Sequence, residues 1–181
     1  DGVEADDVIG TLARQAEAAG MDTLISTGDK DLMQLGSPRI RWYNTMSEEL
    51  LDAAGVEAKF GVPPEKIVDY LALVGDAVDG VPGVSKCGPK TAVKWLSEYG
   101  TLENLVAHAD EVKGVVGQNL RAHLDFLPLG KKLVTVVCDF PDLPAPQQLV
   151  ASPPDRETLH ALYSRYNLRS WLRELEGVAP E

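Results

Sequence analysis

The sequence predicts an α/β fold that is followed by a mainly helical region. In the first 62 residues, segments with helical periodicity alternate with short apolar runs that are typical of buried strands. Such alternation is typical of helices packed on a sheet. From Pro63 onward the helical patterns continue, but a loop that is dense in glycine and proline separates them. We therefore expect three parts, at residues 1–62, 63–127 and 128–181.

The first part begins with an amphipathic helix over Ala5–Ala19, which ends because glycine follows it. A short buried strand is expected at Thr23–Ser26 and a second strand at Arg39–Tyr43. A helix is expected over Glu48–Phe60. Ligands of open α/β sheets bind outside the carboxyl ends of the strands, so we expect a site just after Ser26.

The later elements are mostly helices. One helix opens at Pro64, since proline is favoured in a first helical turn, and the next begins near Gly88 and ends before Gly100. We expect Leu133–Cys138 to return to the sheet as a strand and Asp155–Glu174 to form a helix.

The composition is that of an ordinary globular protein, with 44% hydrophobic and 25% charged residues among 181. Cys87 and Cys138 form no metal-ligand spacing, so reduced thiols in a cytoplasm are expected rather than disulfides. We find no signal peptide and no apolar run of about 18 residues, and we expect no membrane partner. The chain begins with Asp rather than Met, so we expect a piece of a longer protein.

The charges are unevenly distributed along the chain. The net charge of −11 argues against nucleic acid as a partner, but residues 1–35 alone hold eight acidic residues against two basic ones. Residues 80–132 hold seven basic and five acidic residues. Within them, Lys86, Lys90 and Lys94 lie in a stretch without any acidic residue. One end of the chain therefore collects carboxylates, and a later loop collects lysines.

Acidic residues gather in three groups, and the first two are candidate ligands of a divalent metal. The first opens the first helix, the second follows the strand that ends at Ser26, and the third flanks the start of the glycine-rich loop. They are Glu4, Asp6 and Asp7; Asp29 and Asp31; and Asp76 and Asp79. Carboxylates are the ligands that hard divalent cations prefer. The first group has an alternative explanation, because the helix dipole stabilises acidic residues in a first turn.

The stretch from Gly83 to Thr91 is a candidate site for a phosphate backbone. Glycine lets the chain approach a phosphate closely, and a helix N-terminus presents free N–H groups to an anion. We expect contacts to nucleic acid from Gly83, Val84, Ser85, Lys86, Gly88, Lys90 and Thr91. One alternative is a nucleotide-binding P-loop, from which the stretch departs because Pro89 precedes the lysine. The other is a plain helix connector with solvated lysines.

The segments GVEADD, STGDKDLMQL and GDAVDGVPGVSKCGPKTA, in this order, resemble the 5'-nuclease domain of bacterial DNA polymerase I, which is related to flap endonucleases. The resemblance implies a partial PIN-like sheet and a helix-three-turn-helix subdomain that binds duplex DNA. It implies that the seven acidic residues hold two ions, Mg²⁺ or Mn²⁺, for phosphodiester hydrolysis near a 5' end. It also implies a possible K⁺ site in the loop.

This sequence departs from the family in two places. Ala77, Val78 and Gly80 stand where the family commonly has small polar residues and Asn. The family's earlier half, with two more aspartates and a basic arch, has no counterpart in these residues. We therefore expect little cleavage by this fragment alone.

The leading hypothesis is a 5'-3' exonuclease and flap endonuclease portion of a DNA polymerase I. It would act on duplex and 5'-flap DNA in primer removal and repair, with a polymerase domain in the same parent chain. A non-catalytic duplex-binding module with a structural acidic cluster is the alternative. A metal-dependent ribonuclease is a third hypothesis, which the glycine-lysine loop disfavours. Metal binding by the aspartates would separate the first hypothesis from the second.

Overall fold

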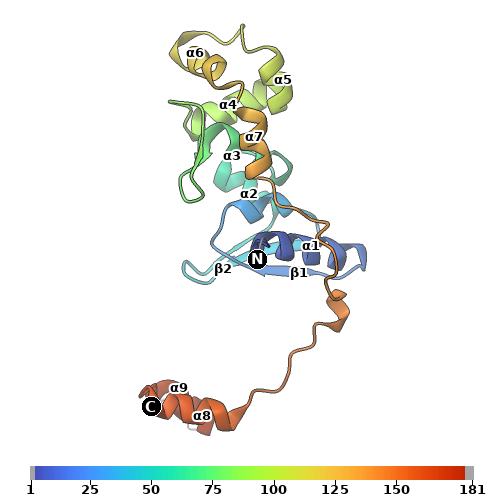
Figure 1. Ribbon diagram of the computed structural model, residues 1–181, viewed down its shortest axis with the longest axis vertical. Coiled ribbons are helices and arrows are strands. Elements are labelled where there is room, and N and C mark those ends of the chain that lie inside the picture. The colour runs from blue at the N-terminus through green and yellow to red at the C-terminus, as the bar shows by residue number, and fades with distance from the viewer. Residues whose placement is uncertain (1–2, 178–181) are drawn as a thin grey trace. The chain divides into compact units, whose positions relative to one another are not determined.

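The computed structural model describes residues 3–177, which form two compact units. The first unit extends to Pro146 and the second begins at Gln147. The α/β part of the first unit contains α1 (Ala5–Ala18), β1 (Thr23–Ser26), the 3-10 turn η1 (Asp31–Leu35), β2 (Ile40–Asn44), β3 (Glu49–Leu51) and α2 (Ala53–Phe60) (Figure 1). Its helical part contains η2 (Pro64–Lys66), α3 (Ile67–Val74), β4 (Gly75–Asp76), β5 (Val81–Pro82), α4 (Pro89–Tyr99), α5 (Leu102–Ala107), α6 (Gly114–His123) and α7 (Leu127–Leu133).

A small sheet and α1 form the start of the first unit. β1 pairs in parallel with β2, which places Ile25 opposite Trp42, and β3 pairs with the other edge of β2 in the antiparallel direction. Ala13 of α1 packs in the same hydrophobic cluster as Ile25 and Trp42. The predictions for α1, β1 and β2 are confirmed, with bounds that differ by at most one residue.

The predicted helix over Glu48–Phe60 is wrong in its first residues. Leu51 of β3 lies opposite Trp42 and is buried, so this stretch pairs with β2 as a strand. α2 begins after Asp52, whose side chain accepts a 2.8 Å hydrogen bond from the N–H of Gly55 and so caps the helix. The local sequence pattern of Glu49–Leu51 suits both a helix and a strand, and pairing with β2 makes it a strand.

α3 is the centre of the helical part. Ile67, Leu71 and Leu73 are fully buried, and α4 and α7 both pack against this helix (Figure 1). The short β4–β5 hairpin follows α3 directly. One hydrophobic cluster runs from Ile25 of the sheet to Leu105 of α5. The α/β part and the helical part therefore share a core.

The strand expected at Leu133–Cys138 is wrong. α7 continues to Leu133, and residues 134–140, which we call the strap, contain no strand. Side chains from other segments form hydrogen bonds with the backbone N–H and C=O groups of the strap instead. Gln34 donates to the carbonyl of Val134 (2.9 Å) and accepts from the N–H of Val136 (3.0 Å). Thr11 of α1 accepts from the N–H of Phe140 (3.0 Å). Because polar side chains pair these groups, the strap needs no strand partner.

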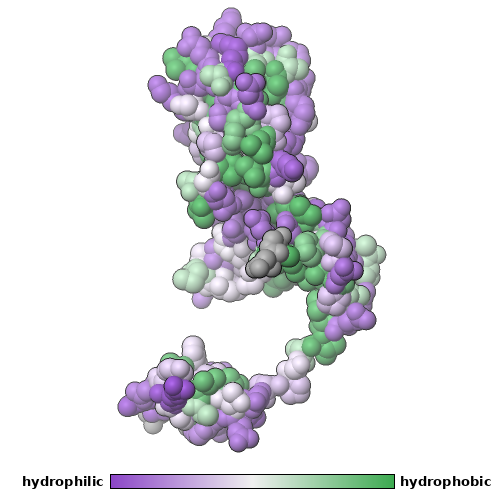
Figure 2. Space-filling view, in the orientation of Figure 1, coloured by the Kyte–Doolittle hydropathy of each residue, from purple (hydrophilic) through white to green (hydrophobic). Residues whose placement is uncertain are grey.

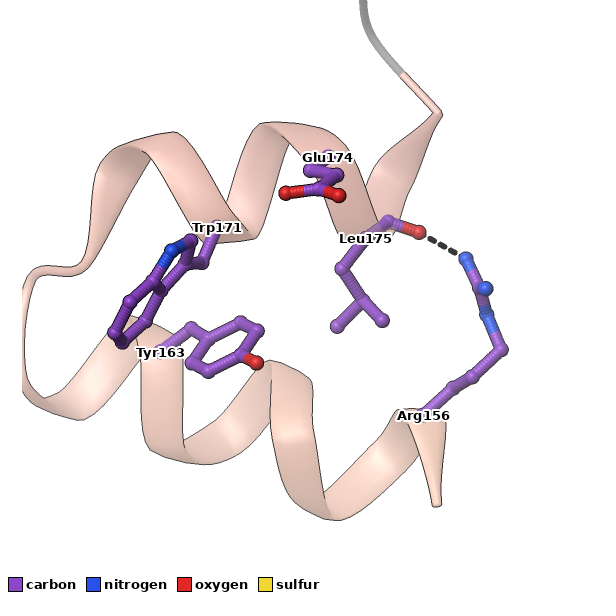
Figure 3. A pocket seen from close by; sticks show the side chains of 5 residues that line it. All are labelled: Arg156, Tyr163, Trp171, Glu174 and Leu175. Atoms are coloured by element: carbon purple, nitrogen blue, oxygen red, sulfur yellow. Dashed lines mark hydrogen bonds between the residues drawn. The ribbon is translucent and has the colours of Figure 1, made fainter. Parts of the chain in front are cut away.

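The second unit is a pair of helices. The 3-10 turn η3 (Pro146–Gln148) lies at the division between the units, and the helices are α8 (Arg156–Arg165) and α9 (Arg169–Glu176). The expected single helix over Asp155–Glu174 is therefore interrupted, at a turn where Asn167 has a left-handed φ of 56°. Tyr163 and Trp171 face each other across the pair, with ring centroids 5.7 Å apart, and Arg156 donates to the carbonyl of Leu175 (Figure 3).

The face of the helical part that Figure 2 shows is largely hydrophilic and includes an apolar area. Figure 2 shows this area where Figure 1 places α7, whose Leu129 and Leu133 are about half exposed. None of the helices within residues 3–177 is both long and apolar enough to span a bilayer.

Candidate metal centre and nucleic-acid interface

The end of β1 positions the second acidic group. Thr27 accepts a 2.9 Å hydrogen bond from the N–H of Asp29, and the carboxylate of Asp29 accepts a 3.0 Å bond from the N–H of Asp31. These bonds hold a tight turn that leads into η1. Asp31 is only 5% exposed, although its neighbour Asp29 faces solvent. The site expected after Ser26 therefore contains one buried and one exposed carboxylate.

The β4–β5 hairpin brings the third acidic group to the same place. Asp76 is 1% exposed, and its Oδ1 accepts a 2.9 Å hydrogen bond from the N–H of Val78. Asp79 lies exposed at the turn of the hairpin. Ligand oxygens of Asp31, Asp76 and Asp79 all lie within 4.8 Å of one another, and we call these three residues the acidic cluster. Residues more than 40 positions apart in the sequence thus meet as a possible metal site.

The residues of the first acidic group, Glu4, Asp6 and Asp7, have two different kinds of surroundings. Asp6 lines a cavity of about 590 Å³ together with Glu4 and Asp79. Asp79 also lines a second cavity, of about 390 Å³, with Asp29 and Asp76. Burial, followed by repulsion from neighbouring carboxylates, raises the pKa of Asp6, and the neighbours are Asp29, Glu4, Asp79 and Asp7. Glu4 and Asp6 therefore belong to the same acidic region as the other two groups.

Asp7 has a partner of a different kind. Its Oδ1 accepts a 2.8 Å hydrogen bond from the N–H of Val137 in the strap. Glu4 occupies the N-cap position of α1 with an extended backbone, but its side chain makes no capping hydrogen bond within the described residues. Asp7 thus connects α1 to the strap, which is a structural role that its position in the sequence did not reveal.

The acidic cluster fits a divalent cation. Oδ1 of Asp31 is buried and has no hydrogen-bond partner among the described residues. Burial, followed by repulsion from Asp76, raises the pKa of Asp31 to about 7. Burial opposes ionisation of Asp76, but hydrogen bonds from Lys30 and the N–H of Val78 outweigh it and lower the pKa of Asp76. Buried carboxylate oxygens that lack partners are the donors that Mg²⁺ and Mn²⁺ take.

Lys30 is a site residue that the search for ligands missed. Its ammonium contacts Oδ2 of Asp76 and lies 3.8 Å from Oδ1 of Asp31. Burial disfavours the charge, but the contacts with Asp76 and Asp31 outweigh it and raise the pKa of Lys30. The only signal in the sequence was the position of the lysine between two aspartates in GDKD, whereas its contact with Asp76 depends on the fold.

Asp69 is a second residue that was missed. It is 7% exposed on α3, accepts a 2.9 Å hydrogen bond from the N–H of Leu102 and pairs with Lys131 of α7 at 2.7 Å. Its signal was an acidic residue within the apolar run IVDYLALV. Asp69 connects α3, α5 and α7 and lies outside the acidic cluster.

The Gly83–Thr91 loop joins the β4–β5 hairpin to α4, and its residues have unlike surroundings. Val84 is buried, and its N–H donates to the carbonyl of Leu73 (2.9 Å). Ser85 is exposed and its carbonyl accepts from Asn119 (2.7 Å). Lys86 has a left-handed φ of 64° and is exposed. Backbone bonds and Asn119 therefore hold the loop in place with one lysine directed to solvent.

The two glycines of the loop differ in the room around them. A Cβ on Gly83 would lie 2.2 Å from the backbone of Val74, whereas nothing lies within 4 Å of the corresponding position at Gly88. Gly88 precedes α4, and Lys90 and Thr91 lie in the first turn of that helix, with Lys90 exposed. The open approach for a phosphate is therefore at Gly88, while Gly83 serves packing.

Solved structures share this arrangement of sheet and helices. The chain superimposes on the bacteriophage T5 5'-exonuclease with bound zinc at a TM-score of 0.70 and 20% identity, over 76% of this chain and 52% of that one. It superimposes on the catalytic core of Rad2 in complex with DNA at 0.60 and 16% identity, over 95% and 62%. At this identity the likeness establishes the fold, which is that of 5'-nucleases.

Sequence comparison establishes the family. The model described as 5'-3' exonuclease, N-terminal resolvase-like domain, matches residues 1–61, and the one described as 5'-3' exonuclease, C-terminal SAM fold, matches residues 62–157. The chain belongs to the 5'-3' exonuclease family. The expected α/β and helical fold class and the resemblance stated from the motifs are confirmed.

The similar curated proteins are DNA polymerases I. The chain is 43% identical over 189 residues to that of Pseudomonas aeruginosa, covering all of this chain and 21% of the relative. It is 46% identical over 142 residues to that of Rhizobium leguminosarum, covering 78% and 14%. The chain thus spans about a fifth or less of the length of these relatives.

Proposed function

We propose that this chain supplies metal ligands and duplex contacts to a 5'-3' exonuclease and flap endonuclease, as a portion of a DNA polymerase I that acts in primer removal and repair. The observation that carries the proposal is the meeting of carboxylates from separate segments beside the hairpin that leads into the Gly83–Thr91 loop. The family of the chain and its polymerase relatives support the same reading.

Asp31, Asp76 and Asp79 would hold Mg²⁺ or Mn²⁺, with Asp29, Asp6 and Glu4 at the edge of the same region. Divalent cations held by carboxylates supply positive charge that stabilises the attacking and leaving oxygens of a phosphodiester during hydrolysis. Asp76 is fixed by the N–H of Val78, so one ligand is already oriented before any ion binds. The zinc-bound T5 exonuclease supports a divalent ion at this fold.

The loop would bind the DNA backbone without reading its sequence. Lys86 and Lys90 are exposed, and Gly88 leaves the N-terminus of α4 open to a phosphate. The T5 and Rad2 structures solved with DNA support DNA binding by proteins of this fold. A K⁺ ion at the loop, a 5'-flap substrate, a polymerase domain in the same parent chain and a cytoplasmic location complete the proposal, and they rest on the family resemblance.

A second candidate is a duplex-binding module in which the acidic cluster is structural. The contact between Lys30 and Asp76 favours it, because an ammonium already balances part of the buried negative charge. Under this candidate the carboxylates would stabilise the hairpin, and no divalent ion would be required.

Asp79→Asn tests the two candidates, because Asp79 is exposed and its change leaves the core intact. In the natural protein that carries this sequence, the change should slow Mg²⁺-dependent cleavage of a 5'-flap duplex by about 100-fold or more, given the several kcal/mol that a metal site contributes. Duplex affinity should be nearly unchanged. Asp110→Asn, at an exposed position outside the site, is the matched control. Cleavage at the unaltered rate by the Asp79 variant would favour the second candidate.

A further inference from the structure

We propose that the Lys30 ammonium is a built-in counter-ion of the acidic cluster, and that it leaves Asp76 when a divalent cation binds. This inference rests on the proposed metal site. It assigns Lys30 a role as a positioning residue: it stabilises the cluster before metal binds and competes with the metal for the same oxygen.

The contacts of Asp76 point to such an exchange. Oδ1 of Asp76 accepts from the N–H of Val78, and Oδ2 contacts the Lys30 ammonium. The hairpin backbone orients Oδ1, which leaves Oδ2 as the less constrained oxygen for a cation. A cation placed among Asp31, Asp76 and Asp79 therefore meets the ammonium at Oδ2 of Asp76. Two cations cannot share this small space without strong repulsion.

Lys30 has room to move, whereas Asp76 has little. The Lys30 side chain is 33% exposed and that of Asp76 is 1% exposed. Lys30 lines the 390 Å³ cavity beside Asp79 and also a separate cavity of about 210 Å³ that is lined by Asn44 and Glu49. A flexible four-carbon stem can carry the ammonium from one cavity to the other. Glu49, whose Oε2 pairs with Lys59, has a second carboxylate oxygen there that can accept from the ammonium.

The charges explain why a counter-ion is needed. Three carboxylates converge here, two of them buried, and a single ammonium contacts two of the three. Without a cation of either kind, the repulsion among them would disfavour the folded hairpin. The ammonium lowers this cost in the metal-free protein, and the same contact weakens metal binding because it must be broken first.

Lys30→Met tests the exchange, because methionine keeps an unbranched apolar stem and removes the charge. The matched control is Lys113→Met, which removes an exposed lysine just before α6 that lines neither of the two cavities beside Lys30. Thermal unfolding in a chelator and Mn²⁺ titration by calorimetry are measured for both variants and for the unaltered chain. Lys30→Met should unfold at a lower temperature without metal and bind Mn²⁺ about tenfold more tightly, within the range usual for two coupled sites. The control should bind Mn²⁺ with unaltered affinity.

The outcomes separate this inference from the proposed function. Absence of Mn²⁺ binding by every protein would overturn the proposed metal site itself. Mn²⁺ binding by the unaltered chain, with equal or weaker affinity in Lys30→Met, would overturn only the exchange.

A measurement on the unaltered sequence covers the case in which the variant does not fold. Lysines are reductively methylated with ¹³C, and Mg²⁺ is titrated while their NMR signals are followed. The Lys30 signal should move toward the position of solvated lysines as Mg²⁺ saturates, and the Lys86 signal should stay fixed. A Lys30 signal that is unmoved by saturating Mg²⁺ would contradict the exchange.

Discussion

At the scale of single residues, Asp31 is where burial and charge oppose each other most directly. It is almost fully buried, faces Asp76 and has an oxygen with no hydrogen-bond partner among residues 3–177. A carboxyl whose pKa is raised by folding binds its proton more tightly in the folded chain than in the unfolded one. The metal-free protein therefore carries a cost that appears as Asp31 ionises.

The raised pKa of Asp31 determines the direction in which the stability of the metal-free protein changes with pH. The pKa of Asp31 rises from 3.8 to about 7 on folding, so the folded state binds more protons within this interval. The free energy of unfolding should therefore fall as the pH rises from about 4 to about 7 in a chelator. Asp31→Asn should flatten this fall, as measured by urea unfolding across that range. Equal slopes for both proteins would show that Asp31 titrates normally.

Asp7 allows a second test at this scale, because its hydrogen bond and its proposed metal role depend on different properties. Asn keeps an oxygen that can accept from the N–H of Val137, whereas Ala removes it. Asp7→Ala should lower the free energy of unfolding by about 1 kcal/mol, and Asp7→Asn should lower it less. If Asp7 also binds metal, both changes should slow cleavage by a factor of about 10 or more. Full cleavage activity in both variants would exclude a metal role for Asp7 and leave only its hydrogen bond to the strap.

The sequence predicted much of the candidate site but not its internal balance of charge. The position of Asp31 after a strand and the family resemblance for Asp76 and Asp79 were sufficient to propose these three residues, which the structure brings within one small space. Lys30 and the partner of Asp7 were missed, since both depend on which distant segment lies opposite. Spacing along one element does not carry that information.

At the scale of elements, the two loop glycines give a matched pair of substitutions. Gly83→Ala should lower the free energy of unfolding by about 1 to 3 kcal/mol or more, because its Cβ would overlap the backbone of Val74. Gly88→Ala should change stability little, since the space around it is open. It should weaken duplex binding if the backbone approaches a phosphate there, as fluorescence anisotropy would measure. A stable Gly83→Ala protein would contradict the packing described for the hairpin.

Lys131 gives another contrast at this scale, because it pairs with a nearly buried and with an exposed carboxylate. Asp69→Ala should lower the free energy of unfolding by about 3 kcal/mol or more, as removal of one partner of a buried pair also leaves the N–H of Leu102 without its acceptor. Glu103→Ala should cost less than about 1 kcal/mol, since Glu103 is two-thirds exposed. Chemical denaturation of both variants provides the comparison. Similar losses would mean that the buried network does not hold α5 and α7 to α3.

Elements with strong local signals were predicted well, and elements that depend on tertiary pairing were not. β1 and α4 have clear boundaries in glycine, proline and apolar runs. β3 was taken for the start of a helix because only its register with β2 makes it a strand. The prediction of a strand at Leu133–Cys138 is wrong because Gln34 and Thr11, from distant segments, pair with the backbone of the strap.

At the scale of the whole molecule, the uneven charge reconciles a net charge of −11 with DNA as a proposed partner. Each phosphate contact made by a lysine contributes about 0.9 to the slope of log affinity against log salt. Replacing both Lys86 and Lys90 by Ala should therefore reduce this slope by about 1.8 for any duplex sequence. Lys59→Ala, in a surface ion pair of α2, is the control. An unaltered slope in the double variant would show that these lysines are solvated and make no phosphate contacts.

The β4–β5 hairpin has a consequence for where the proposed nuclease would cut. Asp76 and Asp79 lie on the hairpin, and the loop begins at Gly83, so only a few residues of fixed backbone separate a ligand from the loop. The distance from a phosphate bound at Gly88 to the scissile one would therefore be set by the hairpin together with the loop up to Gly88. The cleavage position would then be counted in nucleotides from the point of contact, whatever bases lie between.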